Sequence, residues 1–131
     1  MQTHPVGDKA SLSGIRRRIR ADLARAGVDP AKTFDCLVAV TEACANALLH
    51  GTREPDVTPP VVGWEIDGDA IRFSVRDFSA HPWSARAAHP SSGDGDRVGG
   101  FGLELMRGLM DRVDIRIDGD GTVVELIKRL S

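Results

Sequence analysis

The chain has 131 residues, of which 41% are hydrophobic and 27% charged, which fits one globular domain spanning residues 1–131. The formal net charge of -2 disfavours direct nucleic-acid binding, because neutralising phosphates requires a surplus of basic residues. No uncharged stretch approaches the ~20 apolar residues that span a bilayer, and the first ten residues lack the apolar segment of a signal peptide. We therefore expect a cytoplasmic domain that contacts neither nucleic acid nor membrane.

A first helix is predicted from Ser11, as its N-cap, to about Ala26, with Gly27 ending it. Its apolar residues recur at helical spacing: Leu12, Ile15, Ile19 and Leu23. Its outer face carries five arginines: Arg16, Arg17, Arg18, Arg20 and Arg25. Two interpretations stay open, a solvated basic face and a docking surface for an acidic partner protein.

A second helix is predicted from Pro30 to about Leu49, with Gly51 after it. Most of its surface is small or apolar, so we expect it to be buried. Three polar residues spaced by four positions form one ridge beside the apolar face: Glu42, Asn46 and His50.

Two cysteines, Cys36 and Cys44, fall within this second helix. Eight residues of helix place them about 12 Å apart, which is too far for a disulfide. We interpret them as packing residues in a reducing compartment.

Strands are predicted at Val61–Asp67 and Ala70–Asp77, around a turn at Gly68-Asp69. In the second strand, alternation places Asp77 on the same side as the core residues. Two more strands, Arg112–Ile117 and Thr122–Arg129, follow later in the chain. Four strands that each leave one polar face predict a mostly antiparallel sheet, so the helices share its other side in a two-layer α+β sandwich.

Residues 78–98 have no hydrophobic period and are rich in Ala, Ser, Gly, Pro and His, so they are interpreted as disordered or as a functional lid. A third helix is predicted to open at Gly99-Gly100-Phe101-Gly102, just before Leu103. Backbone N–H groups left free at such a helix N-terminus bind anions readily.

Together these features supply a carboxylate (Glu42), an amide that can ligate a cation (Asn46), an inward acceptor (Asp77) and a phosphate-binding turn. Each feature alone has a plainer explanation, as a rim pair, a strand-terminal turn residue or a tight turn. Their order along the chain is more specific, and it favours a nucleoside triphosphate site.

The segment VTEACANALLHG (40–51) resembles the N-box of the GHKL ATPases, which include histidine kinases, type II topoisomerases and Hsp90. Its E-x-x-x-N core and trailing H-G are most similar to the small anti-sigma-factor serine kinases of the RsbW/SpoIIAB type. VRDFSAHPW (75–83) stands where that family has its D-x-G-x-G box, and GGFGLELMRGLMDRVDI (99–115) is similar to its G-x-G-L box. GTVVELIKRL (121–130) resembles the last strand, so the resemblance covers roughly residues 10–130.

The resemblance implies the Bergerat ATP-binding fold and a role for each matching residue. Glu42 would be the general base, Asn46 would hold the Mg²⁺ that bridges the ATP phosphates, and Asp77 would accept a hydrogen bond from the adenine amino group. Gly100, Gly102 and Leu103 would close the phosphate pocket and the lid over 78–98. The remaining positions assigned to nucleotide binding are His50, Gly51, Ser79 and Gly99.

The implied function is an ATP- and Mg²⁺-dependent kinase that binds a sigma factor and phosphorylates a serine on a STAS-type anti-sigma antagonist. Ser79 and His81 replace the two glycines of the D-x-G-x-G box, which favours an alternative: a catalytically weak nucleotide-binding module that sequesters a partner. The N-terminus looks too short for the family's edge strand, so a homodimer is left open. His81 and His89 are interpreted as solvated rather than as metal ligands.

Overall fold

The computed structural model describes residues 1–51, 58–78, 94–119 and 121–131. In these ranges three helices lie with a five-stranded sheet, which confirms the predicted α+β class. The elements in chain order are β1 (Gln2–Pro5), α1 (Lys9–Arg25), α2 (Pro30–Gly51), β2 (Val61–Asp67), β3 (Ala70–Asp77), α4 (Asp94–Leu109), β4 (Arg112–Asp118) and β5 (Gly121–Arg129).

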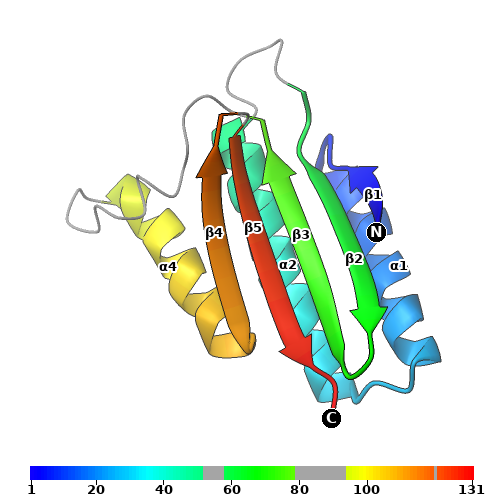
Figure 1. Cartoon of the computed structure of the whole chain (residues 1–131). Coiled ribbons are helices and arrows are strands. Elements are labelled where there is room, and N and C mark those ends of the chain that lie inside the picture. Colours follow the sequence, from blue (N-terminus) through cyan, green and yellow to red (C-terminus); the bar gives the residue numbers. More distant parts are fainter. Residues whose placement is uncertain (52–57, 79–93, 120) are drawn as a thin grey trace.

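The sheet has the strand order β1-β2-β3-β5-β4, and every pair of neighbours is antiparallel (Figure 1). The predicted hairpin between β2 and β3 is present, and Gly68 adopts the positive φ of 62° that its tight turn requires. The pairing of β3 with β5 sets Asp77 opposite Thr122. This register places the end of β3 beside the start of β5.

The N-terminus, which was expected to be too short for the family's full edge strand, forms an edge strand of four residues. Residues Gln2–Pro5 form β1, which pairs with the first four residues of β2. The ring of His4 stacks on that of Trp64 with centroids 5.0 Å apart, and Val6, just after β1, is fully buried. The segment QTHP has no apolar alternation, so its strand conformation follows from pairing and stacking rather than from a local pattern.

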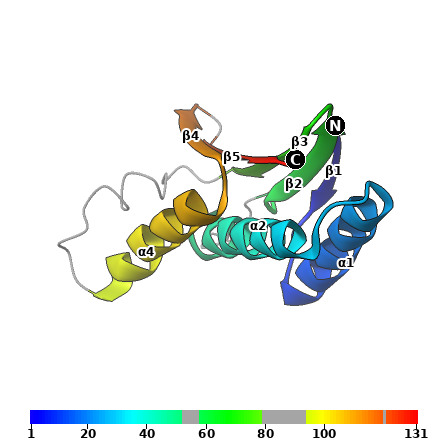
Figure 2. The same cartoon turned by 90° about the horizontal axis from the view of Figure 1, so that it is seen from below.

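All three helices lie on one side of the sheet, in a single layer (Figure 2). Among the buried core residues in the described ranges, Phe73 is the one aromatic, and the others are aliphatic or sulfur-containing. The largest fully buried side chains of the core include Ile19, Leu23, Ile71, Phe73, Met106 and Leu126. Of the helices in the described ranges, none is both long and apolar enough to cross a membrane.

Both ends of α1 are capped by identifiable hydrogen bonds. The N-cap is Asp8 rather than Ser11: its Oδ1 accepts from the Ser11 backbone N–H at 2.8 Å, so Ser11 lies inside the first turn. At the other end Gly27 has a φ of 75°, and its N–H donates to Ala24 O while the Val28 N–H donates to Leu23 O. This is a Schellman motif, and it confirms the predicted stop at Gly27.

Helix α4 begins at Asp94, five residues before the predicted start at Gly99. Gly99, Gly100 and Gly102 therefore lie within the helix, and its free N-terminal N–H groups belong to the turn that begins at Asp94. Each helical glycine costs only about 1 kcal/mol relative to alanine, and the segment contains no proline, so three glycines do not prevent helix formation. The prediction that the helix begins at these glycines was therefore wrong, whereas their assignment to nucleotide binding stays a prediction.

Candidate functional site

Helix α2 places Glu42 and Asn46 one turn apart on the same face. The side chain of Asn46 is only 1% exposed, whereas Glu42 is half-buried. The helix can carry these polar groups into the interior because several of its other positions are small and buried. Ala39, Ala43 and Ala47 are buried along its length.

Gly102 of α4 lies directly against this pair. A Cβ atom at position 102 would lie 3.0 Å from Glu42 Cγ and 3.1 Å from Asn46 Nδ2, and closer still to Glu42 Oε1. These separations are tighter than ordinary van der Waals contact, so only glycine fits at this position without displacing its neighbours. The structure thus brings Gly102 against Glu42 and Asn46, which precede it in the sequence by 60 and 56 residues.

The polar groups of the pair are poorly compensated. Burial raises the pKa of the Glu42 carboxyl above its ordinary value, because a partly desolvated carboxylate is harder to ionise. The Nδ2 atom of Asn46 is buried and has no hydrogen-bond partner in the described part of the chain. An unsatisfied buried donor costs about 1–3 kcal/mol, and such groups concentrate where a ligand completes the network.

Asp77 lies at the end of β3, on the side that faces the helices, and is 2% exposed. Opposite it, Thr122 is 1% exposed, and its Oγ1 is buried without a partner among the described residues. The end of β3, the start of β5 and the C-terminal end of α2 all lie at the same end of the molecule (Figure 1). Two of the predicted features, the Glu42/Asn46 ridge in the second half of α2 and Asp77 at the end of β3, therefore lie on elements that end at the same end of the molecule.

Thr122 was missed as a site residue by sequence reasoning. No local signal in the sequence points to it, because its position opposite Asp77 depends on the register between β3 and β5, two strands that are distant in the chain. The neighbouring Gly121, with a φ of 146°, lies so close to the Asp77 backbone that a Cβ there would clash with the carbonyl. The backbone at the start of β5 therefore lies in close contact with the backbone at the end of β3.

Some of the remaining predicted site residues lie within the described part of the chain and others lie outside it. Gly51 is the last residue of α2, and Leu103 is partly buried against the core. The side chain of His50 and the whole of Ser79 lie outside the described residues, as do His81, His89 and most of the predicted lid. The last residues of that predicted lid, from Asp94 on, are helical.

Comparison with known proteins was made on both sequence and fold. The profile of the histidine kinase-like ATPase domain family matches residues 6–128. Serine-protein kinase RsbW of Bacillus licheniformis is 32% identical over 105 residues, covering 74% of this chain and 64% of that one. The anti-sigma F factor of Anoxybacillus flavithermus is 29% identical over 96 residues, covering 70% of this chain and 66% of that one. The chain thus spans just under two-thirds of the length of these relatives.

A crystal structure of RsbU and RsbW domains from Mycobacterium tuberculosis has the same fold. Its TM-score to this chain is 0.73 at 23% sequence identity, over 98% of this chain and 31% of that one. At 23% sequence identity this structural similarity establishes the shared fold alone. Because the family profile covers all but the first five and last three residues, the chain belongs to the histidine kinase-like ATPase domain family.

Proposed function

We propose that this protein is an ATP-dependent anti-sigma-factor serine/threonine kinase, which binds a sigma factor and phosphorylates a STAS-type anti-sigma antagonist. The observation that carries the proposal is the contact of Gly102 with Glu42 and Asn46. It sets a carboxylate and a buried amide, whose Nδ2 has no hydrogen-bond partner among the described residues, against one glycine of α4. The family membership and the names of the two relatives, a serine-protein kinase and an anti-sigma factor, support the same function.

The residues present fit ATP and Mg²⁺. Two buried polar atoms, Asn46 Nδ2 and Thr122 Oγ1, are unpartnered within the described ranges, and the buried Asp77 carboxylate lies opposite Thr122. Asn46 would hold the Mg²⁺ through its amide oxygen, and Asp77 and Thr122 would receive the adenine. The metal would offset the negative charge of the phosphates during transfer.

Glu42 has the properties of a general base. Its raised pKa makes the ionised carboxylate a stronger proton acceptor than an exposed glutamate, and its side chain remains partly accessible. As the serine oxygen of the antagonist bonds to the γ-phosphorus and the bond to the β,γ-bridging oxygen breaks, the serine proton would pass to Glu42. ADP would leave, and the proton would then be released to water.

The experiment that tests this proposal is phosphate transfer from γ-labelled ATP to a STAS-type antagonist. We expect Glu42→Gln to lower the transfer rate at least about a hundredfold, the usual contribution of a general base, while ATP binding is retained. Glu104→Gln is the matched control, because Glu104 is exposed on α4 and outside the site. A parental transfer rate in Glu42→Gln would show that the assigned base is wrong.

A second candidate is a nucleotide-binding module that sequesters its partner without turnover. It is favoured by Ser79 and His81, which stand in place of two glycines of the D-x-G-x-G box. The same assay separates the two functions, since the module would bind ATP yet give no labelled antagonist in either the parent or Glu104→Gln.

A further inference from the structure

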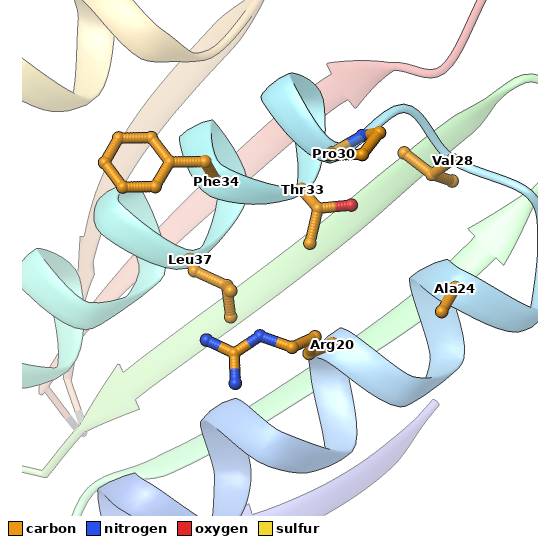
Figure 3. A pocket seen from close by; sticks show the side chains of 7 residues that line it. All are labelled: Arg20, Ala24, Val28, Pro30, Thr33, Phe34 and Leu37. Atoms are coloured by element: carbon orange, nitrogen blue, oxygen red, sulfur yellow. The ribbon is translucent and has the colours of Figure 1, made fainter.

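A furrow runs between α1 and α2 on the side of the helix layer that faces away from the sheet. One hollow of about 330 Å³ lies between Arg20 and Ala24 of α1 and Thr33, Phe34 and Leu37 of α2. Figure 3 shows the guanidinium of Arg20 reaching toward Leu37 and the ring of Phe34 projecting away from the other labelled side chains. None of the residues that line this hollow belongs to the candidate nucleotide site.

A second hollow, of about 540 Å³, continues the first. Its lining includes Lys9 and Arg16 of α1 and Ala45, Leu48 and Leu49 of α2. Arg16 and Arg20 are one helical turn apart, so the two hollows adjoin along α1. We call the two hollows together the α1–α2 furrow; from position 9 to position 24 it is about 22 Å long, the length of a helix of about 15 residues.

The walls of the furrow carry large apolar side chains in water. Phe34 is 64% exposed and Leu49 is 48% exposed, at opposite ends of α2. None of the described elements covers the far side of α1 and α2 (Figure 2). Exposed apolar surface that gathers along one groove, rather than being scattered, is typical of a protein interaction site.

The charge of the furrow has one sign. Each charged residue that lines either hollow is basic, namely Lys9, Arg16 and Arg20. No ion pair to any of these three is found in the described part of the chain, and the Nε atom of Arg16 is buried without a hydrogen-bond partner there. Cationic groups held beside an apolar surface without acidic partners favour an acidic ligand.

On the sheet, in contrast to the furrow, arginines form ion pairs with acidic residues of the same chain. Four arginines of β3 and β4 each pair with an acidic residue: Arg72 with Glu65, Arg76 with Asp118, Arg112 with Asp114 and Arg116 with Glu125. These four arginines of the sheet are therefore paired within the chain, whereas no ion pair of the furrow's arginines is found among the described residues.

We propose that the α1–α2 furrow docks an amphipathic α-helix of a partner protein. The apolar face of that helix would fill the space between Phe34 and Leu49, and its acidic residues would meet Arg16 and Arg20. Length, apolar lining and charge all match such a helix. The proposal is independent of ATP use, because no residue of the furrow belongs to the nucleotide site.

The test is an NMR titration of the protein with two synthetic amphipathic peptides of about 16 residues, identical except that one has Glu and the other Lys on the polar face. We expect the Glu peptide to shift the backbone amide signals of α1 and α2, and the affinity to fall as salt is added. The double variant Arg16→Glu/Arg20→Glu should weaken binding at least about tenfold. Arg17→Glu/Arg107→Glu changes the net charge equally outside the furrow and should leave binding within about threefold.

Three outcomes would overturn the proposal. The first is equal binding of the Glu and Lys peptides, or no binding. The second is a set of shifted signals outside α1 and α2. The third is a self-associating protein in sedimentation whose dimer is abolished by Phe34→Ala but not by Ile117→Ala, an exposed apolar control on β4, because a second copy would then cover the furrow.

Discussion

Gly102 determines how closely α4 approaches α2. We expect Gly102→Ala to lower the free energy of unfolding by about 1–3 kcal/mol, because the methyl group would push against Glu42 and Asn46. Gly108→Ala is the matched control on the same helix, since a Cβ at that position meets no atom within 4 Å. That control should be neutral or gain up to about 1 kcal/mol from helix propensity. Urea unfolding followed by circular dichroism measures both, and equal effects of the two substitutions would contradict the close contact.

The partly buried carboxylate of Glu42 is predicted to lower the stability of the folded protein at neutral pH. Because its pKa is raised in the folded state, the folded protein binds this proton more tightly than the unfolded chain does. The stability that this provides is present below the unfolded pKa and is lost as the pH rises through the folded pKa. Glu42→Gln should therefore unfold at a higher urea concentration than the parent at pH 7, with the difference shrinking in acid. A variant less stable than the parent at pH 7 would contradict the desolvation of Glu42.

The same pKa shift predicts the pH dependence of transfer. The rate should fall in acid through an apparent pKa above the ~4.3 of an exposed glutamate, because protonated Glu42 cannot accept the serine proton. The residual rate of Glu42→Gln should lack this limb. A pH profile of single-turnover transfer tests the assignment, and an identical acid limb in both proteins would count against it.

The two cysteines are free and buried, as their spacing predicted. Burial raises the pKa of the Cys36 and Cys44 thiols to about 12, so both stay protonated near neutral pH. We expect a disulfide reagent to label neither thiol in the native protein and both after unfolding in urea. Rapid labelling without denaturant would show that α2 is more open than the structure indicates.

Among the elements, Lys128 of β5 connects α2 and α4. Its Nζ donates to the Leu109 carbonyl at 2.6 Å, at the end of α4, and to Asp35 Oδ2 at 3.3 Å, near the start of α2. Lys128→Met should cost about 1–3 kcal/mol, because a partly buried acid and a carbonyl lose their donor. Lys32→Met is the control: Lys32 has one bond, to the Arg129 carbonyl at 3.3 Å, among exposed groups. Thermal unfolding compares the two, and an equal loss would contradict the bridging role.

The sequence predicted the helices and strands whose own patterns specify them. α2 and the β2–β3 hairpin were found with their bounds nearly right, since their apolar spacing and turn residues agree with the fold. β1 was missed because the pairing with β2 and the His4–Trp64 stack form it, and neither contact is visible in a four-residue segment. The start of α4 was misplaced because glycine was interpreted as a boundary, although Gly102 is needed inside the helix for close packing.

The residues of the candidate site could likewise be predicted from the sequence only where a local pattern specifies them. Glu42, Asn46 and Asp77 could be chosen from spacing and strand parity, which are local properties of one helix and one strand. The contact of Gly102 with Glu42 and the pairing of Asp77 with Thr122 depend on how distant elements pack, so they required coordinates.

The sheet face and the helix face of the protein differ in whether their arginines form ion pairs. On the open face of the sheet four arginines pair with acidic residues, whereas the helix face leaves Arg16 and Arg20 beside exposed apolar surface. A net charge of -2 conceals this asymmetry. The proposed nucleotide site lies between the layers and the proposed docking furrow lies on the outer helix face, so the two proposals assign ATP and a partner protein to separate surfaces.

The most direct test of the nucleotide site is calorimetric titration of MgATP into the parent, Asp77→Asn and Asp67→Asn. Asp67 is the control because it is an exposed carboxylate at the far end of the neighbouring strand β2. We predict that the parent and Asp67→Asn bind with the same affinity and that Asp77→Asn binds at least about tenfold more weakly, since a buried acceptor for adenine is lost. Failure of the parent to bind MgATP, or equal affinity in Asp77→Asn, would contradict the account.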